Sequence, residues 1–215
     1  SARSARPRAA CSRRSSKPMF HDIPDHIARR MAYLERLDAE HRRHESISHF
    51  DRLRQIPPAT GKFLALLAAN APEGMCLELG TSGGYSTLWL ALAAREAGRK
   101  IVTFEKSEGK LRLAHETMKA AGVEDTVEIV AGNALDHVAR YKQVAFCFLD
   151  VEKQIYTDCY EAIVPNLVRG GLLVADNVIS HRDEAAPMLK RALTDGRVDA
   201  LIVPVGSGLL VARKI

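Results

Sequence analysis

Apolar residues near the start of the chain recur every three or four positions. They form one stripe made of Ile23, Ile27, Met31, Leu34 and Leu37. This spacing predicts an amphipathic helix over residues 24–44, with Pro24 in its first turn, where proline is well tolerated. Such a stripe needs a partner. The partner is expected to be either the body of the same chain or a second copy of it, as in a homodimer.

Beyond Pro57 and Pro58 the pattern changes to short apolar runs that alternate with helical segments. Residues 63–69 predict a short helix. Strands are expected at 75–79, 100–105, 127–130, 144–150 and 171–176, and helices between them at 85–97, 107–121, 134–140 and 154–168. Because these strands do not alternate apolar with polar residues, they suit a parallel sheet that helices cover on both faces.

The end of the chain departs from this alternation. After a helix expected at 183–195, apolar runs at 200–203 and 209–212 flank Gly206-Ser-Gly208. Strands so close in sequence pair as an antiparallel hairpin. The predicted fold class is therefore α/β, a doubly wound, Rossmann-like sheet, mostly parallel with a C-terminal antiparallel hairpin, plus N-terminal helices. Plain dinucleotide-binding domains usually lack that finish.

Length and composition agree with one globular domain and an extension. The 215 residues are 47% hydrophobic and 27% charged, an ordinary balance for a folded protein. We expect a disordered basic tail over residues 1–18, a helical extension over 19–55 and the α/β domain over 56–215. No run approaches the roughly 18–20 apolar residues of a membrane span, so no membrane association is expected.

The net charge of +5 belongs to the tail, because residues 1–18 hold six arginines and lysines and no acid. The rest of the chain is close to neutral and shows no basic stripe, so nucleic-acid binding is not expected. The four cysteines lack C-x-x-C spacing. We expect them to be buried residues with reduced thiols, which predicts a cytoplasmic location.

A glycine-rich segment, Glu78-Leu-Gly80-Thr-Ser-Gly-Gly84-Tyr-Ser86, lies between a predicted strand and a predicted helix. Doubly wound sheets bind ligands beyond the carboxyl ends of their strands. Glycines let the backbone approach a ligand, and the following helix start attracts an anion. S-adenosylmethionine suits this place, because its carboxylate matches the helix start with Ser86, and its ammonium matches Glu78. Glu105, at the end of the next strand, is expected to accept the ribose hydroxyls.

Two other interpretations of the glycine segment stay open. A nicotinamide or flavin site would want G-x-G-x-x-G, whereas the glycines here are Gly80, Gly83 and Gly84, and Glu78 would repel a pyrophosphate. The glycines would otherwise serve only a tight turn. A non-catalytic cofactor-binding or interaction protein on the same fold is the alternative from another functional class.

Further motifs carry a resemblance to a family. The segment from about Ile56 to Ile215, with E-L-G-T-S-G-G-Y-S at 78–86, L-D-V-E-K at 149–153 and A-D-N-V-I at 175–179, resembles class I, metal-dependent O-methyltransferases of the catechol and caffeoyl-CoA type. The resemblance implies that Asp150, Asp176 and Asn177 bind a divalent cation and that Lys153 is the catalytic base. It implies a cofactor pocket formed by Glu78, Gly80, Ser82, Gly84, Tyr85, Ser86, Glu105, Asn133, Ala134 and Asp150.

The chemistry of the second set of residues can be argued from their donor atoms. Two carboxylates and an amide carbonyl are hard oxygen ligands that suit Mg²⁺. Such an ion would chelate the neighbouring oxygens of a small, catechol-like acceptor. Lowering a phenol pKa of about 10 by about 3 units would contribute roughly 4 kcal/mol to forming the nucleophile. The expected function is O-methyl transfer. In the plainer alternative, Asp176-Asn177 only forms a turn and Lys153 is a solvated residue.

Overall fold

The computed structural model describes residues 20, 22–44, 46–48 and 51–215. The tail predicted at 1–18, including Cys11, lies outside the described residues. The other three cysteines, Cys76, Cys147 and Cys159, are free and buried, as expected. None of the helices in the described ranges is long and apolar enough to cross a membrane.

Within the described part of the chain, seven strands form one sheet in the order β3-β2-β1-β4-β5-β7-β6. The strands are β1 (Met75–Leu79), β2 (Ile101–Glu105), β3 (Val127–Ala131), β4 (Val144–Leu149), β5 (Leu167–Ala175), β6 (Val198–Val203) and β7 (Leu209–Lys214). The first five strands pair in parallel, while β7 inserts antiparallel between β5 and β6. The predicted fold class is confirmed, and the strand order reverses between β1 and β4.

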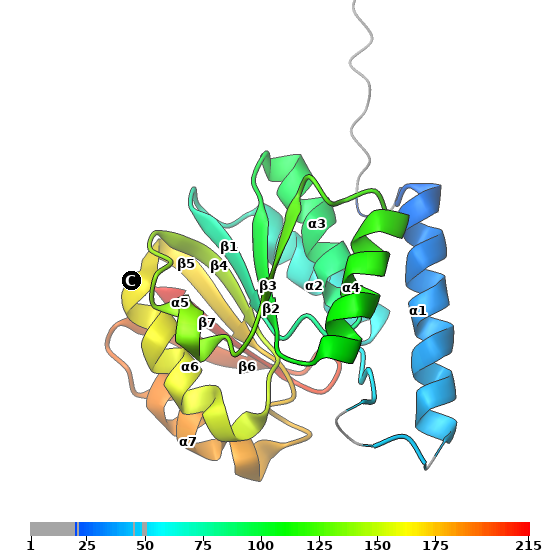
Figure 1. Cartoon of the computed structure of the whole chain (residues 1–215). Helices are drawn as coiled ribbons and strands as arrows, with labels where there is room; N and C mark the ends of the chain where they lie inside the picture. Colours follow the sequence, from blue (N-terminus) through cyan, green and yellow to red (C-terminus); the bar gives the residue numbers. More distant parts are fainter. Residues whose placement is uncertain (1–19, 21, 45, 49–50) are drawn as a thin grey trace, which may run out of the picture.

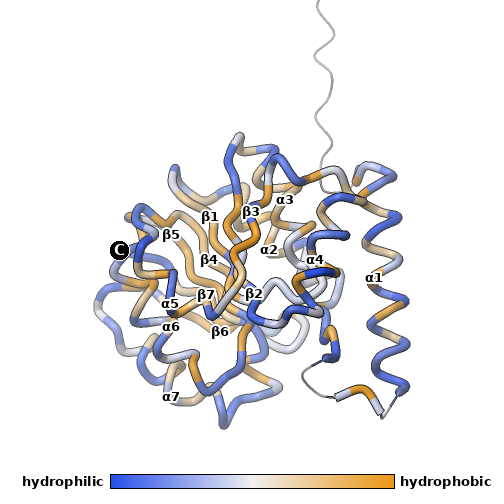
Figure 2. The backbone as a smooth tube through the Cα atoms, viewed as in Figure 1, coloured by the Kyte–Doolittle hydropathy of each residue, from blue (hydrophilic) through white to orange (hydrophobic). Residues whose placement is uncertain are grey.

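Helices cover both faces of the sheet (Figure 1). They are α1 (Asp25–Arg43), α2 (Pro58–Ala69), α3 (Tyr85–Ala97), α4 (Glu108–Ala120), α5 (Leu135–Val138), α6 (Tyr156–Ile163) and α7 (Arg182–Leu193). One core cluster joins α2 and α3 to one face of the sheet, and a second joins α6 and α7 to the other. Figure 2 shows the hydrophobic strands between these two layers. Burial on both faces explains why the strands lack polar alternation.

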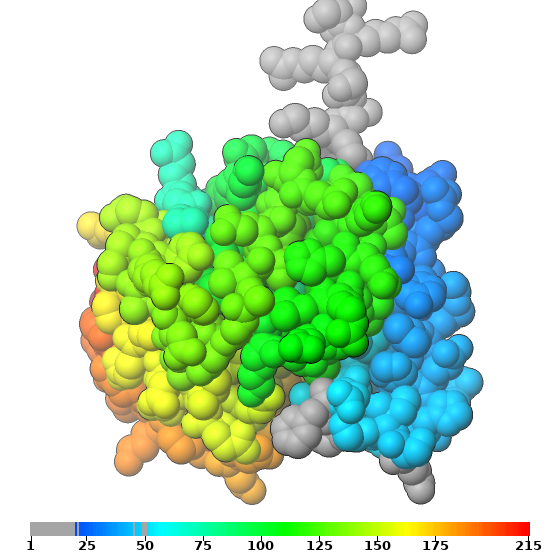
Figure 3. Space-filling view, in the orientation of Figure 1, coloured from blue at the N-terminus to red at the C-terminus, as the bar shows by residue number. Residues whose placement is uncertain are grey.

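The N-terminal helix α1 finds its partner within the same chain. Ile27, Met31 and Leu34 are buried in the core that α3 and α4 share. Figure 3 shows α1, in blue, running along the green α4 side of the molecule. Arg30 ties the two helices together, because its Nε and Nη2 donate to Thr117 Oγ1 at 3.1 and 2.9 Å. The amphipathic stripe is thus covered without a second copy, and the homodimer stays a prediction.

Two predicted boundaries are wrong. The helix expected at 63–69 begins five residues earlier, at Pro58, because proline at the first helical position needs no partner for a backbone N–H. The helix expected at 154–168 ends at Ile163, a 3-10 turn follows at Val164–Asn166, and β5 begins at Leu167 rather than at residue 171. Pro165 explains the stop, since it has no backbone N–H and its ring clashes with the preceding helical turn. The chain therefore enters the sheet four residues earlier, and Val144 of β4 pairs with Leu167.

Candidate active site

A pocket of about 890 Å³ opens at the carboxyl ends of β1, β2, β4 and β5, where the strand order reverses. This is the place where doubly wound sheets bind ligands. Of the residues predicted for the site, the pocket wall contains Gly80, Ser82, Tyr85, Ser86, Glu105, Asn133, Ala134, Asp150, Lys153 and Asn177. The wall does not include Glu78, Gly84 or Asp176. The structure thus brings most residues of both predicted sets to one cavity.

Two positions in the glycine loop combine a positive φ with a close neighbour. Gly80 has φ +103°, and a Cβ there would overlap the carbonyl oxygen of Asp150. The same two strand ends are joined by a 2.9 Å hydrogen bond from Asp150 N to Leu79 O. Gly84, at φ +90°, precedes α3, and a Cβ there would lie 2.6 Å from Met118 Cε. Only glycine fits both positions without strain.

Glu105 is held rigidly at the end of β2. Its Oε2 accepts from Ser82 N at 2.8 Å, and its Oε1 accepts from Lys106 N and Ser107 N at 2.9 and 2.8 Å. A carboxylate offers about four acceptor sites, of which three are used here. Glu105 is therefore fixed in place. In this arrangement it can accept about one further hydrogen bond, whereas binding both ribose hydroxyls would require two.

Glu78 lies behind the pocket wall, fully buried. Its Oε2 accepts from Thr87 Oγ1 at 2.5 Å and from Thr103 Oγ1 at 2.7 Å. Its Oε1 is buried with no hydrogen-bond partner among the described residues. Burial raises the pKa of this carboxyl to about 7. Glu78 thus has an unused acceptor oxygen close to the start of α3, which suits a cationic ligand group that reaches it.

The N-terminal segment supplies a wall of the pocket that the sequence did not predict. Asp38, Arg42 and residues 52–56 line it. This segment is bonded to the glycine loop, because Ser82 Oγ donates to Leu53 O at 3.0 Å and Tyr85 OH donates to Glu35 Oε1 at 2.6 Å. These contacts join residues about 30 to 50 positions apart and partly involve backbone atoms, so no local sequence motif predicts them. The helical periodicity of α1 was the only available signal.

The second half of the site lies at the ends of β4 and β5. Lys153 Nζ donates to Asp150 Oδ1 at 3.0 Å, to Val151 O at 3.1 Å and to Tyr156 OH at 2.7 Å. Only 9% of the Lys153 side chain is exposed. The backbones of the two strand ends are joined by a 3.0 Å hydrogen bond from Asp176 N to Leu149 O. The lysine and the two aspartates that the resemblance singled out therefore form one compact group.

Asp176 is only 2% exposed, and its Oδ1 is buried without a hydrogen-bond partner in the described part of the chain. Burial and the neighbouring charge of Asp150 raise the pKa of Asp176 to about 7. Asn177 follows in the left-handed region, at φ +60°, an arrangement that costs energy and often marks functional sites. An orphaned carboxylate oxygen beside a second carboxylate fits a divalent cation, which would satisfy both.

The set of residues predicted to bind a cation differs from a site built only of acids, histidines and cysteines. No group of three or more His, Cys, Asp or Glu side chains placed to hold a metal ion occurs among the residues that the structure describes. The trio predicted here has two carboxylates and one amide, and amide oxygens are also ligands for hard cations.

The outer rim beside this centre is polar. It includes Gln154, Ser180, His181, Glu184 and Ser207. His181 is exposed, and its Nδ1 lies 3.0 Å from Ser180 Oγ. Trp89 is buried against Gly61 of α2 and does not line the pocket.

The sheet order, the C-terminal hairpin and the glycine loop together define a Rossmann-like methyltransferase. A family model described as O-methyltransferase matches residues 26–215. The chain therefore belongs to this O-methyltransferase family, which confirms the resemblance found in the sequence.

Individual relatives agree with this assignment. Catechol O-methyltransferase of Mycobacterium tuberculosis is 39% identical over 121 residues, covering 55% of this chain and 54% of that protein. Catechol O-methyltransferase of Niastella koreensis is 35% identical over 129 residues, covering 58% of each. The matched segment thus spans little more than half the length of these curated relatives. The structure of an O-methyltransferase from Bacillus cereus in complex with SAH superposes with a TM-score of 0.72 at 26% identity, covering 87% of this chain and 91% of that one.

Proposed function

We propose that this protein transfers a methyl group from S-adenosylmethionine to a hydroxyl of a small, catechol-like acceptor, with a divalent cation, expected to be Mg²⁺, assisting. One observation carries the proposal: the glycine loop and Glu105 line the same cavity as Asp150, Lys153 and Asn177. A cofactor site alone would leave the acceptor open. The carboxylates and lysine beside it supply what ionising a chelating hydroxyl requires.

The cofactor is assigned from the chemistry of the wall. Glu105 would bind the ribose, the start of α3 at Tyr85 and Ser86 would receive the carboxylate, and Asn133 and Ala134 would border the adenine. Glu78 would accept the ammonium through its unused Oε1. The volume of about 890 Å³ lies in the upper part of the roughly 300–1,000 Å³ range of ligand pockets. It suits a cofactor with a small acceptor beside it, and the SAH complex of the Bacillus cereus relative supports this cofactor.

The residues that would hold the cation are Asp150, Asp176 and Asn177. When bound there, a divalent ion supplies a charge that holds two neighbouring acceptor oxygens and favours the anion of one of them. The orphaned Oδ1 of Asp176 is the feature of this chain that supports the assignment. The polar rim of Gln154, Ser180 and Ser207 suits a small hydroxylated acceptor rather than a large apolar one.

Lys153 is proposed as the catalytic base. The acceptor oxygen forms a bond to the methyl carbon as the carbon–sulfur bond breaks, and the acceptor's proton leaves to the Lys153 amine. In this structure Nζ donates three hydrogen bonds, the pattern of an ammonium ion. Lys153 can act as the base only as the neutral amine, so one of these protons must first pass to solvent. Holding the acceptor and methyl groups in attack geometry would supply much of the remaining acceleration, with effects of up to about 7–11 kcal/mol known for such positioning.

The test is a transfer assay with methyl-labelled S-adenosylmethionine, Mg²⁺ and a panel of catechols, each matched with the monophenol that lacks the second hydroxyl. We expect transfer to the catechols, little to the monophenols, and loss of transfer when a chelator is added. Transfer that a chelator leaves unchanged would remove the cation from the proposal. Equal transfer to the monophenols would remove the chelated acceptor.

Calorimetry separates the alternatives. Binding of S-adenosylmethionine without any binding of Mg²⁺ would favour a non-catalytic cofactor-binding protein. Tight binding of NADH in place of S-adenosylmethionine would favour an oxidoreductase. The proposal requires binding of both S-adenosylmethionine and the divalent ion.

A further inference from the structure

Tyr156, in the first turn of α6, is a fully buried tyrosine that the proposed chemistry does not use. Its hydroxyl accepts a hydrogen bond from Lys153 Nζ at 2.7 Å, the shortest of the three that this ammonium group donates. The hydroxyl also lies within donating distance of two backbone carbonyls, Leu149 O at 3.2 Å and Asp176 O at 3.1 Å. One phenol therefore contacts the lysine and the ends of two strands.

These two carbonyls stand next to the predicted cation ligands. Leu149 is the last residue of β4 and precedes Asp150, while Asp176 follows β5 and precedes the left-handed Asn177. A hydroxyl has one proton to donate and two lone pairs to accept with. The Tyr156 proton is thus shared by the two strand ends, and a lone pair holds Lys153. Burial raises the pKa of Tyr156 well above its ordinary value.

We propose that Tyr156 is a positioning residue of the reacting centre, whose hydroxyl fixes Lys153 Nζ relative to the ends of β4 and β5. This inference rests on the proposed function, because it gives Lys153 its place beside the acceptor. Tyr156 does not line the pocket and contacts no ligand position itself. It acts through Lys153 and through the backbone that carries Asp150 and Asn177.

The geometry explains why a hydroxyl is needed at this position. The lysine side chain has four rotatable carbon–carbon bonds and loses much freedom when it is fixed. Asp150 and Val151 hold it only from the β4 side. Without the Tyr156 hydroxyl, Nζ would keep only the contact with the aromatic ring, whose centroid lies 4.5 Å away. It would lose the hydrogen bond that links it, through this hydroxyl, to Asp176 O at the end of β5.

The chain offers a matched control in Tyr160, one turn further along α6. Tyr160 is also fully buried, and its hydroxyl donates to Asp195 Oδ2 at 2.9 Å, away from the pocket. Tyr156→Phe and Tyr160→Phe therefore each remove one buried hydroxyl from the same helix. Only the first removes a contact to Lys153.

The experiment measures kcat, KM and thermal stability of Tyr156→Phe and Tyr160→Phe. We expect kcat of Tyr156→Phe to fall roughly 10- to 100-fold, the range for losing a hydrogen bond to a charged group, with KM for S-adenosylmethionine within about twofold of wild type. We expect Tyr160→Phe to lower Tm and to keep kcat within about twofold. Equal kcat values in the two variants would overturn the inference.

A second readout does not need activity. In the crystal structure of Tyr156→Phe we expect Lys153 Nζ to leave its 3.0 Å contact with Asp150 Oδ1 or to occupy several positions, with the helix unchanged. A single, unmoved lysine would overturn the positioning role even if the wild-type protein transferred no methyl group. A displaced lysine in a protein without transferase activity would instead refute the proposed function alone.

Discussion

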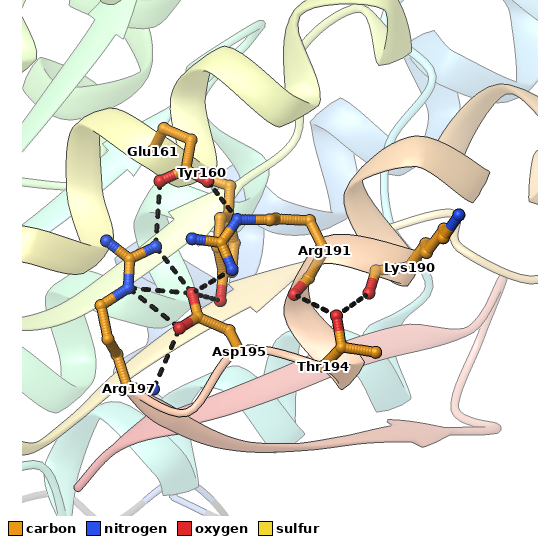
Figure 4. Close-up of polar contacts among 7 residues, drawn as sticks. All are labelled: Tyr160, Glu161, Lys190, Arg191, Thr194, Asp195 and Arg197. Atoms are coloured by element: carbon orange, nitrogen blue, oxygen red, sulfur yellow. Dashed lines mark hydrogen bonds and ion pairs between the residues drawn. The ribbon is translucent and has the colours of Figure 1, made fainter.

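Asp195 and Asp176 are both buried aspartates, one just after the helix α7 and the other just after the strand β5, yet their surroundings are opposite. Asp195 lies after α7 among donors: Arg197 Nη2 at 2.6 Å, Arg191 Nη1 at 3.1 Å and Tyr160 OH at 2.9 Å (Figure 4). These donors hold the pKa of Asp195 well below its usual range. Asp176 has a buried oxygen with no partner in the described ranges, and its pKa is raised.

Under the proposed function, this difference separates a carboxylate that stabilises the fold from carboxylates placed to bind a ligand. The donors around Asp195 join α6, α7 and the start of β6, and Glu161 bridges the same two arginines. A buried carboxylate whose oxygens are all hydrogen-bonded or ion-paired in this way stabilises the folded protein. Unsatisfied carboxylates such as Asp176 and Glu78 cost folding energy and are tolerated where a ligand completes them. The predictions below test this contrast by changing one side at a time.

Asp176→Asn should have the largest effect. It keeps the shape of the side chain and removes a buried charge, so the free protein should be as stable as wild type or more stable. Methyl transfer should fall roughly 1,000-fold, because a cation that stabilises developing charge contributes several kcal/mol. Initial rates and Tm measured on the same preparation check both parts. A variant that unfolds, or that keeps wild-type rates, would recast Asp176 as structural.

Glu78→Gln should weaken S-adenosylmethionine binding about 10- to 100-fold, since the ammonium loses a charged partner. The folded pKa of Glu78 is raised from 4.5 to about 7, so its contribution to wild-type stability declines as pH rises through that window. The glutamine lacks this decline. Denaturant unfolding should therefore show the variant up to about 3 kcal/mol more stable than wild type at pH 8 and close to it at pH 4.5. A stability difference that is the same at both pH values would contradict the buried, proton-binding carboxyl.

Asp195→Asn should lower stability and leave methyl transfer unchanged, the reverse of what we expect for Asp176→Asn. The free energy of unfolding should fall by about 1–2 kcal/mol at pH 7, because charge-assisted hydrogen bonds to partly exposed arginines are lost. The wild-type contribution is present above the ordinary aspartate pKa and is lost as pH falls through the lowered folded value. Transfer per folded molecule and cofactor affinity should not change. A drop in kcat with unchanged stability would break the contrast.

Glu35→Gln should have the smallest effect. It weakens the 2.6 Å hydrogen bond from Tyr85 OH that joins α1 to the start of α3. We expect a two- to fivefold rise in the Kd for S-adenosylmethionine, equivalent to less than about 1 kcal/mol. Glu40→Gln, on an exposed position of the same helix, is the matched control and should leave the Kd unchanged. Equal Kd values for the two variants would show that α1 does not support the cofactor loop.

The sequence predicted most of the fold. It also predicted that most of the candidate site residues follow the ends of strands, because the signals for both are local. A short apolar run marks a buried strand, and the polar residue that follows it marks the carboxyl end, as with Glu105, Asp150 and Asp176. The helix expected at 154–168 was too long, because Pro165 ends the helix although the apolar pattern continues beyond it.

What escaped prediction involves contacts between distant segments. Nothing local marks Leu53 as the acceptor for Ser82, or Tyr156 as the residue that joins two strand ends. The sequence predicted Glu78 as the partner of an ammonium group, but its place behind the pocket wall follows from how β1 packs between β2 and β4. The roles assigned to the individual site residues remain predictions for the variants above.

The central claim is that Asp150, Asp176 and Asn177 form a divalent-cation site while Asp195 belongs to the framework. Titration of the protein with Mn²⁺, followed by the electron paramagnetic resonance signal of the free ion, tests it directly. The account predicts one bound ion per chain in wild type and in Asp195→Asn, and none in Asp176→Asn. A wild-type chain that binds no ion, or an Asp176→Asn variant that binds it as well as wild type, would contradict the account.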